Sequence, residues 1–349
     1  MANPAGPPTA FDSLLVGGTP TRGFSGIPLT SGNVFFCDYV NGSDGATGTA
    51  VDPFKTVYWA YGKCVSGHGD VVVIVSNGAS SGSQRLSVAN AQVATASATT
   101  GTLTWAKDNT HLVGMCSPSS FSQRARLAPP TGTYSVTTFG SANFVVVTGN
   151  GCIFQNISAF NGFSTGGANQ ICWTDTGDRN AYINCDFEGM GDTTSAASAG
   201  SRSFKLGAAG TGEAYFYNCN FGLDTITRGA ANASLELAGG TPRNRFVNCT
   251  FVADASASSP FHILCTGAAA IDRVQLFQDC MFTNAIKSGG TAMSAAISMT
   301  SASPGGLLLL QRCTSVGSTK WGDTNALANV YVDGGAPTAA TSGLAVNPS

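Results

Sequence analysis

The six residues Tyr182-Ile183-Asn184-Cys185-Asp186-Phe187 form a phrase that recurs through the second half of the chain. Related phrases lie at 216–221, 246–251 and 277–282, with a partial copy at 310–313 and an earlier version at 154–160, in which Ile157 replaces the cysteine. The steps from Ile157 through the five cysteines are 28, 34, 30, 31 and 33 residues. Repeats of this size are typical of solenoids, in which each repeat contacts only its neighbours. The sequence therefore predicts a stack of coils.

The composition agrees with a large stacked β structure. Hydrophobic residues make up 43% of the 349 residues, enough for a long core, whereas charged residues make up only 10%, against about 25% in ordinary soluble domains. The 44 glycines suit tight turns. The formal net charge of −2 gives no basic surface for nucleic acid, and no apolar run is long enough to span a membrane. We therefore expect neither nucleic acid nor a membrane as a partner.

Four regions follow from the distribution of prolines, glycines and apolar runs. Residues 1–32 contain five prolines and predict an extended N-terminal arm without a core of its own. Residues 33–66 predict a first strand and a short helix that caps the solenoid, with Asp52 as the N-cap and Pro53 at the first helical position. Residues 67–333 predict the coils, and residues 334–349 a loose C-terminal tail. The first residues show no signal-peptide pattern, so we expect synthesis in the cytoplasm.

Stacking explains the repeated phrase. Because side chains alternate along a strand, we expect Val247, Cys249 and Phe251, and their equivalents in other coils, to face the interior. Asparagine accepts the left-handed backbone conformation that a repeated bend between strands requires. The phrase therefore predicts three structural ladders, one of asparagine, one of cysteine and one of phenylalanine. Their members are Asn156, Asn184, Asn218, Asn248, Cys185, Cys219, Cys249, Cys280, Phe187, Phe221, Phe251 and Phe282.

The 11 cysteines predict buried free thiols that act as small apolar side chains. Cysteines stacked one coil apart have parallel Cα–Cβ bonds, and a disulfide does not form easily in that geometry. Disulfides are also rare in proteins made in the cytoplasm. No Cys-x-x-Cys pair occurs and the three histidines lie far apart in the sequence, so no metal site is predicted.

Three charged residues also recur with the spacing of the repeated phrase. Arg179, Glu213 and Arg243 each lie six residues before a cysteine of the phrase. Stacked coils would place Glu213 between the two arginines, about one strand spacing, ~4.8 Å, from each. Exposed pairs of this kind contribute little stability, so the expectation serves as a test of how the coils are aligned.

The sequence predicts no pair of catalytic carboxylates. A glycoside hydrolase needs two carboxylates beside the bond that it cleaves, and Asp186 and Glu188 lie two residues apart on one strand. The equivalent positions in the next two coils hold no acid, because they are Asn220 and Gly222, then Thr250 and Val252. Asp175 and Asp178 lie in a turn near Arg179, where aspartates normally act as caps.

Other polar residues also favour a structural interpretation. Three aspartates near the first strand could ligate a cation, but a turn and a helix cap are favoured; these are Asp38, Asp44 and Asp52. The histidines offer no triad with a serine nucleophile; they are His68, His111 and His262. The tryptophans could line a sugar-binding groove, although packing is favoured; they are Trp59, Trp105, Trp173 and Trp321. We therefore predict no catalytic, cofactor-binding or metal-binding residues.

The N-terminal part of the chain also resembles a known family. The segments Asn41-Gly42-Ser43-Asp44-Gly45, Pro53-Phe54-Lys55-Thr56-Val57 and Gly69-Asp70-Val71-Val72 follow one another as in right-handed parallel β-helix proteins of the pectate-lyase-like superfamily. Together with residues 103–114 and 123–126, they are similar especially to β-helix virion proteins of tailed bacteriophages. The resemblance covers roughly residues 34–160 by motif. It implies an all-β, single-domain right-handed parallel β-helix with a short N-terminal capping helix.

The resemblance also implies a place in a phage particle. The first hypothesis is a non-enzymatic virion protein, a capsid decoration or cement protein that binds the outer surface of the head and stabilises it. Its expected partners are the major capsid protein or other virion proteins, and further copies of itself, with a trimer favoured. A tail fibre or tailspike that binds or cleaves host surface polysaccharide is the alternative. A free polysaccharide lyase, which would need a strong base and acidic Ca²⁺ ligands, is a third.

Overall fold

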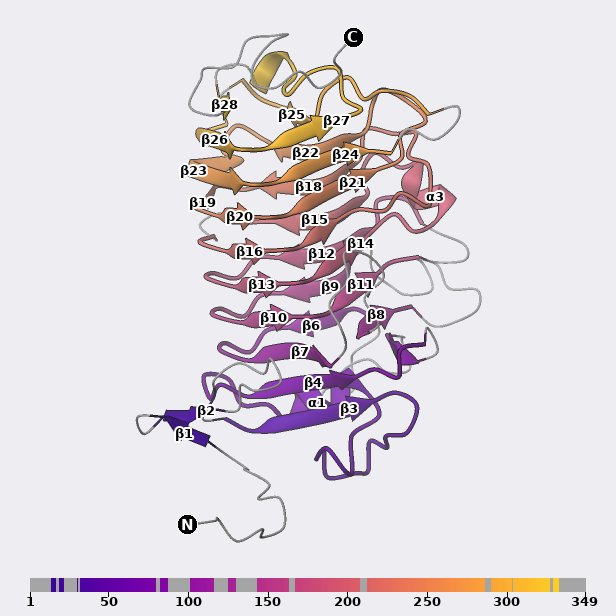
Figure 1. Cartoon of the computed structure of the whole chain (residues 1–349), viewed down its shortest axis with the longest axis vertical. Coiled ribbons are helices and arrows are strands. Elements are labelled where there is room, and N and C mark those ends of the chain that lie inside the picture. The colour runs from indigo at the N-terminus through magenta and orange to yellow at the C-terminus, as the bar shows by residue number, and fades with distance from the viewer. Residues whose placement is uncertain are drawn as a thin grey trace, which may run out of the picture.

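The chain winds as a right-handed parallel β-helix, in which three sheets run along the length of a rod (Figure 1). The computed structural model describes residues 14–16, 19–21, 30, 32–79, 82–86, 101–115, 125–129, 143–162, 167–207, 212–285, 290–302, 304–326 and 329–332. Each sheet is built from strands about one period apart in the sequence, and every pairing along the rod is parallel, as in β10 with β13. The all-β solenoid predicted from the repeat is confirmed.

Within the described residues, the sheets have eleven, eight and seven strands. The eleven-stranded sheet contains β3 (Val34–Asp38), β4 (Val71–Val75), β7 (His111–Met115), β10 (Ile153–Gln155), β13 (Ala181–Ile183), β16 (Tyr215–Tyr217), β19 (Thr241–Pro242), β20 (Arg245–Val247), β23 (Ile271–Gln278), β26 (Gly306–Gln311) and β28 (Val330–Val332). The eight-stranded sheet contains β5 (Gln84–Arg85), β8 (Arg126–Ala128), β11 (Ser158–Phe160), β14 (Asp186–Glu188), β17 (Asn220–Phe221), β21 (Thr250–Ala253), β24 (Met281–Asn284) and β27 (Thr314–Val316). The seven-stranded sheet contains β6 (Leu103–Trp105), β9 (Asn143–Val147), β12 (Ile171–Asp175), β15 (Arg202–Leu206), β18 (Ala233–Ala238), β22 (Phe261–Thr266) and β25 (Ile297–Met299).

The first helix lies at the N-terminal end of the rod, but it begins later than the sequence predicted. Helix α1 spans Val57–Lys63, and Thr56 is its N-cap. Asp52 instead accepts hydrogen bonds from the amide and hydroxyl of Thr47, both at 2.8 Å, and so closes a turn. The prediction of Asp52 as N-cap was wrong because the backbone of Phe54 is extended and pairs with Phe36 and Asp38 on β3. Pro53 therefore precedes an extended residue rather than a helix.

Helix α1 packs one face into the main core. Its buried side chains include Tyr58 and Tyr61, and the Tyr61 ring stacks on Trp105 with 4.1 Å between centroids. The amine of Lys107 donates to the carbonyls of Tyr61, Gly62 and Cys64 at 2.8, 3.1 and 2.6 Å. A cation favours the C-terminal end of a helix, where carbonyls lack partners. These contacts fix α1 against the first coils (Figure 1).

The N-terminal arm has structure that its composition did not predict. Strands β1 (Leu14–Val16) and β2 (Thr19–Thr21) form an antiparallel hairpin. Most of the remaining arm and all of the tail expected at 334–349 lie outside the described residues. Two further short elements lie in connections between sheets, helix α3 (Thr193–Ala196), capped by Asp192, and the 3-10 helix η4 (Thr324–Ala326). None of the helices in the described part of the chain is long and apolar enough to cross a membrane.

The repeated phrase forms the bend between the eleven-stranded and eight-stranded sheets. Asn156, Asn184, Asn218 and Asn248 have φ angles of 53°, 52°, 53° and 53°, which lie in the left-handed region that asparagine accepts better than most residues. The strand before each asparagine belongs to one sheet, and the strand two residues later belongs to the next. One residue per coil therefore turns the chain from sheet to sheet.

This bend changes which side chains face the core. The prediction that Ile183, Tyr217 and Val247 face inward was wrong, because Tyr217 is 42% exposed whereas Phe216 and Phe246 are fully buried. The alternation of a strand does not continue through a left-handed residue, since the bend rotates the chain. Consequently the aromatic residue two before the asparagine and the cysteine directly after it both point into the rod.

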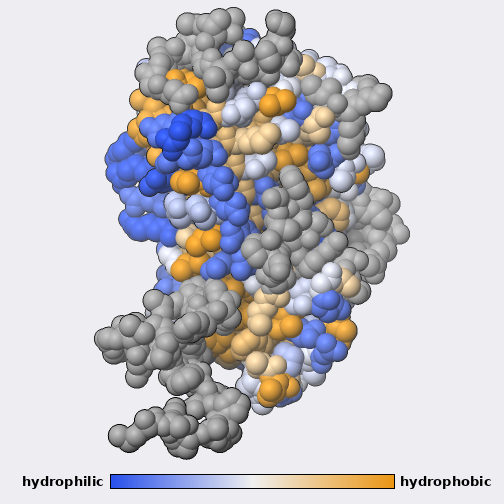
Figure 2. Space-filling model, viewed as in Figure 1, coloured by the Kyte–Doolittle hydropathy of each residue, from blue (hydrophilic) through white to orange (hydrophobic). Residues whose placement is uncertain are grey.

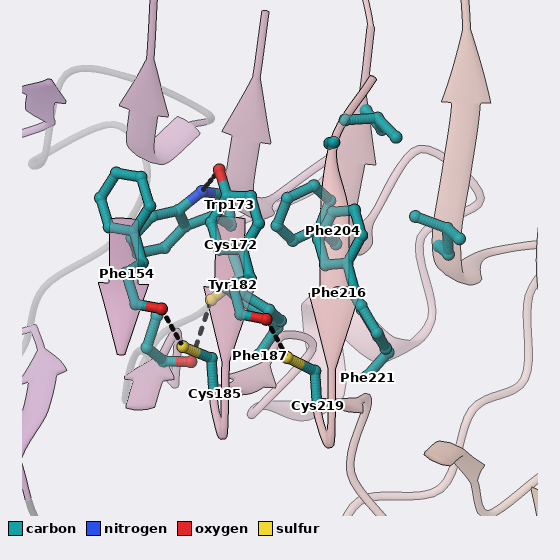
Figure 3. Packing of buried hydrophobic residues seen from close by; sticks show 14 of the residues in the cluster. Phe154, Cys172, Trp173, Tyr182, Cys185, Phe187, Phe204, Phe216, Cys219 and Phe221 are labelled. Atoms are coloured by element: carbon teal, nitrogen blue, oxygen red, sulfur yellow. Dashed lines mark hydrogen bonds between the residues drawn. The ribbon is translucent and has the colours of Figure 1, made fainter. Parts of the chain in front are cut away.

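The core consists of columns of stacked side chains (Figure 3). In the first column the rings of Tyr182 and Phe216 are parallel at 4.8 Å, and this stack continues to Phe246 at 4.5 Å. A second column comes after the cysteines and contains Phe187, Phe221, Phe251 and Phe282, with successive centroid distances of 5.3, 4.8 and 4.7 Å. Stacked rings add specific contacts to the area that they bury. The columns align one coil on the next.

Candidate functional site

The ladder residues predicted from the phrase lie along this bend and in the core. The side-chain amide of Asn184 donates to Asn156 at 3.0 Å, that of Asn218 donates to Asn184 at 2.8 Å, and that of Asn248 donates to Asn218 at 3.0 Å. The position above Asn248 holds Asp279, whose carboxylate accepts two bonds from Arg312 at 2.7 and 2.8 Å. The ladder thus ends in an ion pair between coils.

The cysteines of the phrase lie buried beside the asparagines. Each thiol donates to a carbonyl of the preceding coil, as Cys185 does to Phe154 at 3.3 Å and Cys219 does to Tyr182 at 3.4 Å (Figure 3). The ten cysteines that the structure describes are free and buried, and burial raises the pKa of the Cys219 thiol. A protonated buried thiol is a poor nucleophile. The column therefore contributes packing and weak hydrogen bonds.

The charged column lies where the predicted alignment placed it. Glu213 contacts Arg179 at 2.9 Å and also bonds Arg243, so it lies between the two arginines. These hydrogen bonds and charges hold the pKa of the Glu213 carboxyl below its ordinary value, with Arg243 as the main cause. Figure 2 shows hydrophilic side chains gathered on this side of the rod, near the start of β13, β16 and β20. The alignment of the coils is thereby confirmed.

A second charged cluster lies on the outer face of the seven-stranded sheet, and the sequence did not predict it. Arg202 on β15 binds Glu236 on β18 with 2.7 Å between Nε and the carboxylate. Lys205 lies 3.5 Å from the other carboxylate oxygen, which also accepts the hydroxyl of Thr266 at 2.8 Å. The side chains of Arg202 and Glu236 are each 8% exposed, whereas that of Lys205 is 32% exposed. One amine of the cluster therefore reaches solvent.

Local structure positions these groups. Lys205 and Glu236 are direct partners in the pairing of β15 with β18, and Phe204 and Leu235 beside them face the core. The Arg202 guanidinium also donates to the carbonyls of Ala199 and Ser201, at 2.6 and 2.7 Å, which fixes its direction. A signal for the cluster exists in the sequence, because positions 205 and 236 lie one period apart. The repeated phrase aligns only the strands around the bend, which belong to the eleven-stranded and eight-stranded sheets. The strands of the seven-stranded sheet, such as β15 and β18, share no phrase of their own.

The cluster can bind an anion better than it can act as an acid or base. Both oxygens of Glu236 already accept hydrogen bonds or contact a cation. Because Arg202 and Lys205 carry two positive charges against the one negative charge of Glu236, the cluster has a net positive charge. The same outer row contains Thr174, Lys205, Glu236, Leu264 and Ser298. In this row Glu236 has no neighbouring carboxylate with which to form the pair that hydrolysis of a glycoside requires.

The two acids on β14 are buried on the outer face of the eight-stranded sheet. Asp186 and Glu188 are 1% and 5% exposed, and the amide of Asn220 donates to Asp186 at 2.8 Å. Asp186 pairs with Asn220 and then with Thr250 along the sheet. The alignment from sequence, in which no acid follows Asp186 in the next coils, is confirmed.

The aspartates near the first strand each bind the backbone around them. Asp38 accepts from the amides of Val40 and Asn41, and Asp44 accepts from those of Lys55 and Thr56. Asp52 closes the turn described above. Among the residues that the structure describes, no group of three histidine, cysteine, aspartate or glutamate side chains could hold a metal ion.

His68 and His111 both lie beside Asp70, whereas His262 lies on β22, further along the rod. His68 contacts Asp70 at 2.7 Å, and His111 accepts the amide of Ile153 at 3.0 Å. Burial lowers the pKa of His111 to about 4 and also lowers that of His262. Trp105, Trp173 and Trp321 are buried in the core. The structure brings none of these side chains together with the cluster around Glu236.

Asp175 is the one carboxylate of the predicted turn that lies fully inside the rod. It accepts hydrogen bonds from the Tyr182 hydroxyl at 2.7 Å, from the Gly177 amide at 2.8 Å and from the Asn180 side chain. Burial outweighs these bonds and raises its pKa to about 7. The same environment keeps it from any substrate, so its perturbed pKa reflects packing.

Comparison with known proteins identifies the fold. No protein-family model and no curated protein sequence matches this chain. Among solved structures, pectate lyase Pel9A is similar with a TM-score of 0.59 and 13% identity, over 88% of this chain and 69% of the lyase. A pectin methylesterase from Aspergillus niger has a TM-score of 0.52 and 13% identity, over 91% of each chain. Pectin methylesterase PemA from Erwinia chrysanthemi has a TM-score of 0.50 and 14% identity, over 90% of this chain and 93% of the esterase.

These similarities show a fold shared with pectin-processing enzymes and do not establish an activity, because the sequences are so different.

Proposed function

We propose that the chain is a non-enzymatic structural protein of a tailed-bacteriophage particle, and specifically a decoration protein that binds the outer surface of the head. The observation that carries this proposal is that carboxylates on the outer faces of the rod pair with arginines of neighbouring coils. Glu213, Glu236 and Asp279 are each bound by an arginine of a neighbouring coil. Such pairs join coil to coil and support a stiff rod whose outer faces make contacts. The resemblance of residues 34–160 to phage β-helix virion proteins supports the location.

A protein of this kind acts by adhesion. It stabilises the head by burying its own surface against the major capsid protein, and a specific interface of this type buries about 1,200–2,000 Å². We propose that it does so as a symmetric homo-oligomer, with a trimer favoured. It would be made in the host cytoplasm and would act in the virion.

Quantitative mass spectrometry of purified particles tests this proposal. We expect a copy number comparable to that of the major capsid protein. We also expect heads stripped of this protein to open at a lower temperature, and the purified chain to restore their stability. A copy number of a few per particle, as for a fibre, would contradict a decoration role.

A second candidate function is the binding of a host polysaccharide by a tail fibre or tailspike. The fold shared with pectin-processing enzymes and the cationic cluster of Arg202 and Lys205 favour an acidic polysaccharide as the ligand. Affinity electrophoresis in gels containing polygalacturonate or neutral dextran would detect it. Under this candidate, Lys205→Ala abolishes retardation by polygalacturonate, and Lys55→Ala, which changes an exposed lysine near the N-terminal end of the rod, does not.

The same samples separate binding from cleavage. Release of unsaturated uronate products in the presence of Ca²⁺ would indicate a polysaccharide lyase, and this would overturn the non-enzymatic proposal. Retardation without products would indicate a binding protein. Neither result would be expected of a head decoration protein.

A further inference from the structure

The outer face of the eleven-stranded sheet carries exposed arginine and tyrosine side chains. Tyr215 and Tyr217 on β16 are 37% and 42% exposed, and their rings lie within 12° of parallel, with 6.4 Å between centroids. Arg245 on β20 is exposed and is the direct partner of Tyr215 in the sheet. Arg243, two residues earlier, and Arg273, in the next coil, have side chains that are 55% and 57% exposed. We call these five residues the arginine–tyrosine patch.

The backbone places Arg243 and Arg273 at equivalent positions of consecutive coils. The register pairs Pro242 on β19 with Asp272 on β23, and the arginine that follows each of them has a left-handed φ, of 49° and 64°. Neighbouring strands are about 4.8 Å apart, and like charges opposite one another destabilise a sheet. The fold therefore holds two cations close together at its surface, and an anionic partner would relieve their repulsion.

The carboxylates beside the patch do not balance its arginines. Glu213 is the one carboxylate between Arg179 and Arg243, and Arg245 donates to an uncharged group, the amide oxygen of Gln278, at 3.0 Å. Including the ion pair on β23, these groups hold four arginines and two carboxylates, so two positive charges are in excess. The whole chain, in contrast, has a formal net charge of −2. This side of the rod is therefore suited to an acidic partner (Figure 2).

The combination of arginine and tyrosine favours a protein as that partner. A guanidinium matches a carboxylate through two parallel hydrogen bonds, and arginine and tyrosine are enriched in the centres of protein interfaces. The patch lies on the outside of a sheet, whereas sites for small ligands are concave. We propose that the arginine–tyrosine patch binds an acidic surface of another protein. This inference rests on the proposed function, under which that protein is the major capsid protein, and it identifies the face of the rod that makes the contact.

Rebinding to stripped heads tests the proposal. The purified chain is added to heads from which this protein has been removed, and the amount that sediments with the heads is measured. Arg245→Gln with Arg273→Gln removes two positive charges and leaves the contact of Arg243 with Glu213 in place. We expect this double variant to bind about tenfold more weakly than the parent. Binding of the parent should also fall more steeply with added NaCl than binding of the variant, because salt screens exposed charges.

The matched control is Lys55→Gln with Lys63→Gln. It makes the same change in net charge near the N-terminal end of the rod, where both lysines are exposed, and it should bind like the parent. Circular dichroism checks that all variants are folded. If the patch variant binds as tightly as a parent that does bind the heads, the inference is overturned and the proposed function stands. If the parent does not bind the heads, the proposed function is overturned, and the inference with it.

Two further measurements identify other occupants of the patch. Sedimentation of the purified chain gives its oligomeric state, and dissociation of Arg245→Gln with Arg273→Gln alone would mean that the patch binds a second copy. Retardation by polygalacturonate that is lost in the same variant would mean that it binds an acidic polysaccharide. Either result would overturn the proposal, whereas the same oligomeric state and the same retardation in variant and parent support it.

Discussion

At the scale of single residues, the asparagine bend combines two separable contributions. Asn218 has a φ of 53°, and its side chain donates to Asn184 and accepts from Asn248. Glycine accepts this backbone conformation without strain, whereas alanine does not. The two substitutions therefore remove the same hydrogen bonds but differ in backbone strain.

We expect Asn218→Gly to lower the free energy of unfolding by about 1–2 kcal/mol, mainly through the lost hydrogen bonds. Asn218→Ala should cost about 1 kcal/mol more, because its backbone is strained as well. Equilibrium denaturation with urea measures both values. Equal costs for glycine and alanine would mean that the left-handed conformation is not required at this bend.

Asp175 makes stability depend on pH in a direction opposite to that of most carboxylates. Burial raises its pKa from 3.8 to about 7 in the folded state. Between these values the folded protein retains a proton that the unfolded chain has released. The free energy of unfolding therefore falls as pH rises through this window, by about 1.4 kcal/mol per pH unit for this one group.

The prediction is that Asp175→Asn reduces the loss of stability between pH 5 and pH 7, as measured by urea denaturation at both values. Tyr182→Phe provides the complementary variant. It removes a hydroxyl that donates to the carboxylate and lowers its pKa, so the loss should extend to higher pH. A pH dependence that is identical in the parent and in Asp175→Asn would contradict the assignment.

At the scale of the elements, the pair of Arg202 and Glu236 joins β15 to β18. Without Arg202, the Glu236 carboxylate keeps only the Lys205 amine at 3.5 Å and the Thr266 hydroxyl at 2.8 Å, and removing one partner of a buried ion pair costs up to about 3–5 kcal/mol. We therefore expect Arg202→Met to be strongly destabilising, and the double variant Arg202→Met with Glu236→Leu to recover much of the loss. Thermal unfolding of the two variants measures the difference.

Glu213→Gln is the matched control for this prediction. It breaks a similar pair of contacts between coils, but Arg179 and Arg243 are more than half exposed. Exposed ion pairs are screened by water and salt, so this variant should unfold close to the parent. A double variant no more stable than Arg202→Met alone would show that the cost arises from packing rather than from an unpaired charge.

The bends, strands and first helix differ in how well the sequence predicts them. The bend could be predicted because Asn156, Asn184 and their equivalents occur at a regular spacing and asparagine has a specific backbone preference. The inward face of the preceding strand could not be predicted by alternation, because a left-handed residue interrupts it. The start of α1 was missed for a similar reason, since Phe54 pairs with β3 across the chain and no local signal reveals that pairing.

At the scale of the whole molecule, the repeat predicts the rod because each coil contacts only its neighbours. The candidate site is harder to predict, because the residues around Glu236 come from strands without a shared phrase. The sequence does not single out Lys205 and Glu236 as neighbours; the register of β15 with β18 does.

The solenoid character leads to a prediction about the whole rod. Deleting residues 157–184 joins Asn156 directly to Cys185, and so removes one complete coil while preserving the phrase. The stack should close, because Phe154 would meet Phe216 in the same ring column and β10 would pair with β16. Since stability in such rods is approximately a sum over coils and their interfaces, we expect a folded protein with a cooperative but lower melting temperature.

The matched control deletes residues 158–184 and therefore leaves Ile157 between Asn156 and Cys185. This single extra residue reverses which side chains of the following strand face the core, so Cys185 and Phe187 would point outward. We expect this variant to aggregate or to melt without a cooperative transition, as followed by circular dichroism and sedimentation. If both deletions fold equally well, the coil is not the unit of this structure. If neither folds, contacts made by the deleted coil are needed for the rod to form.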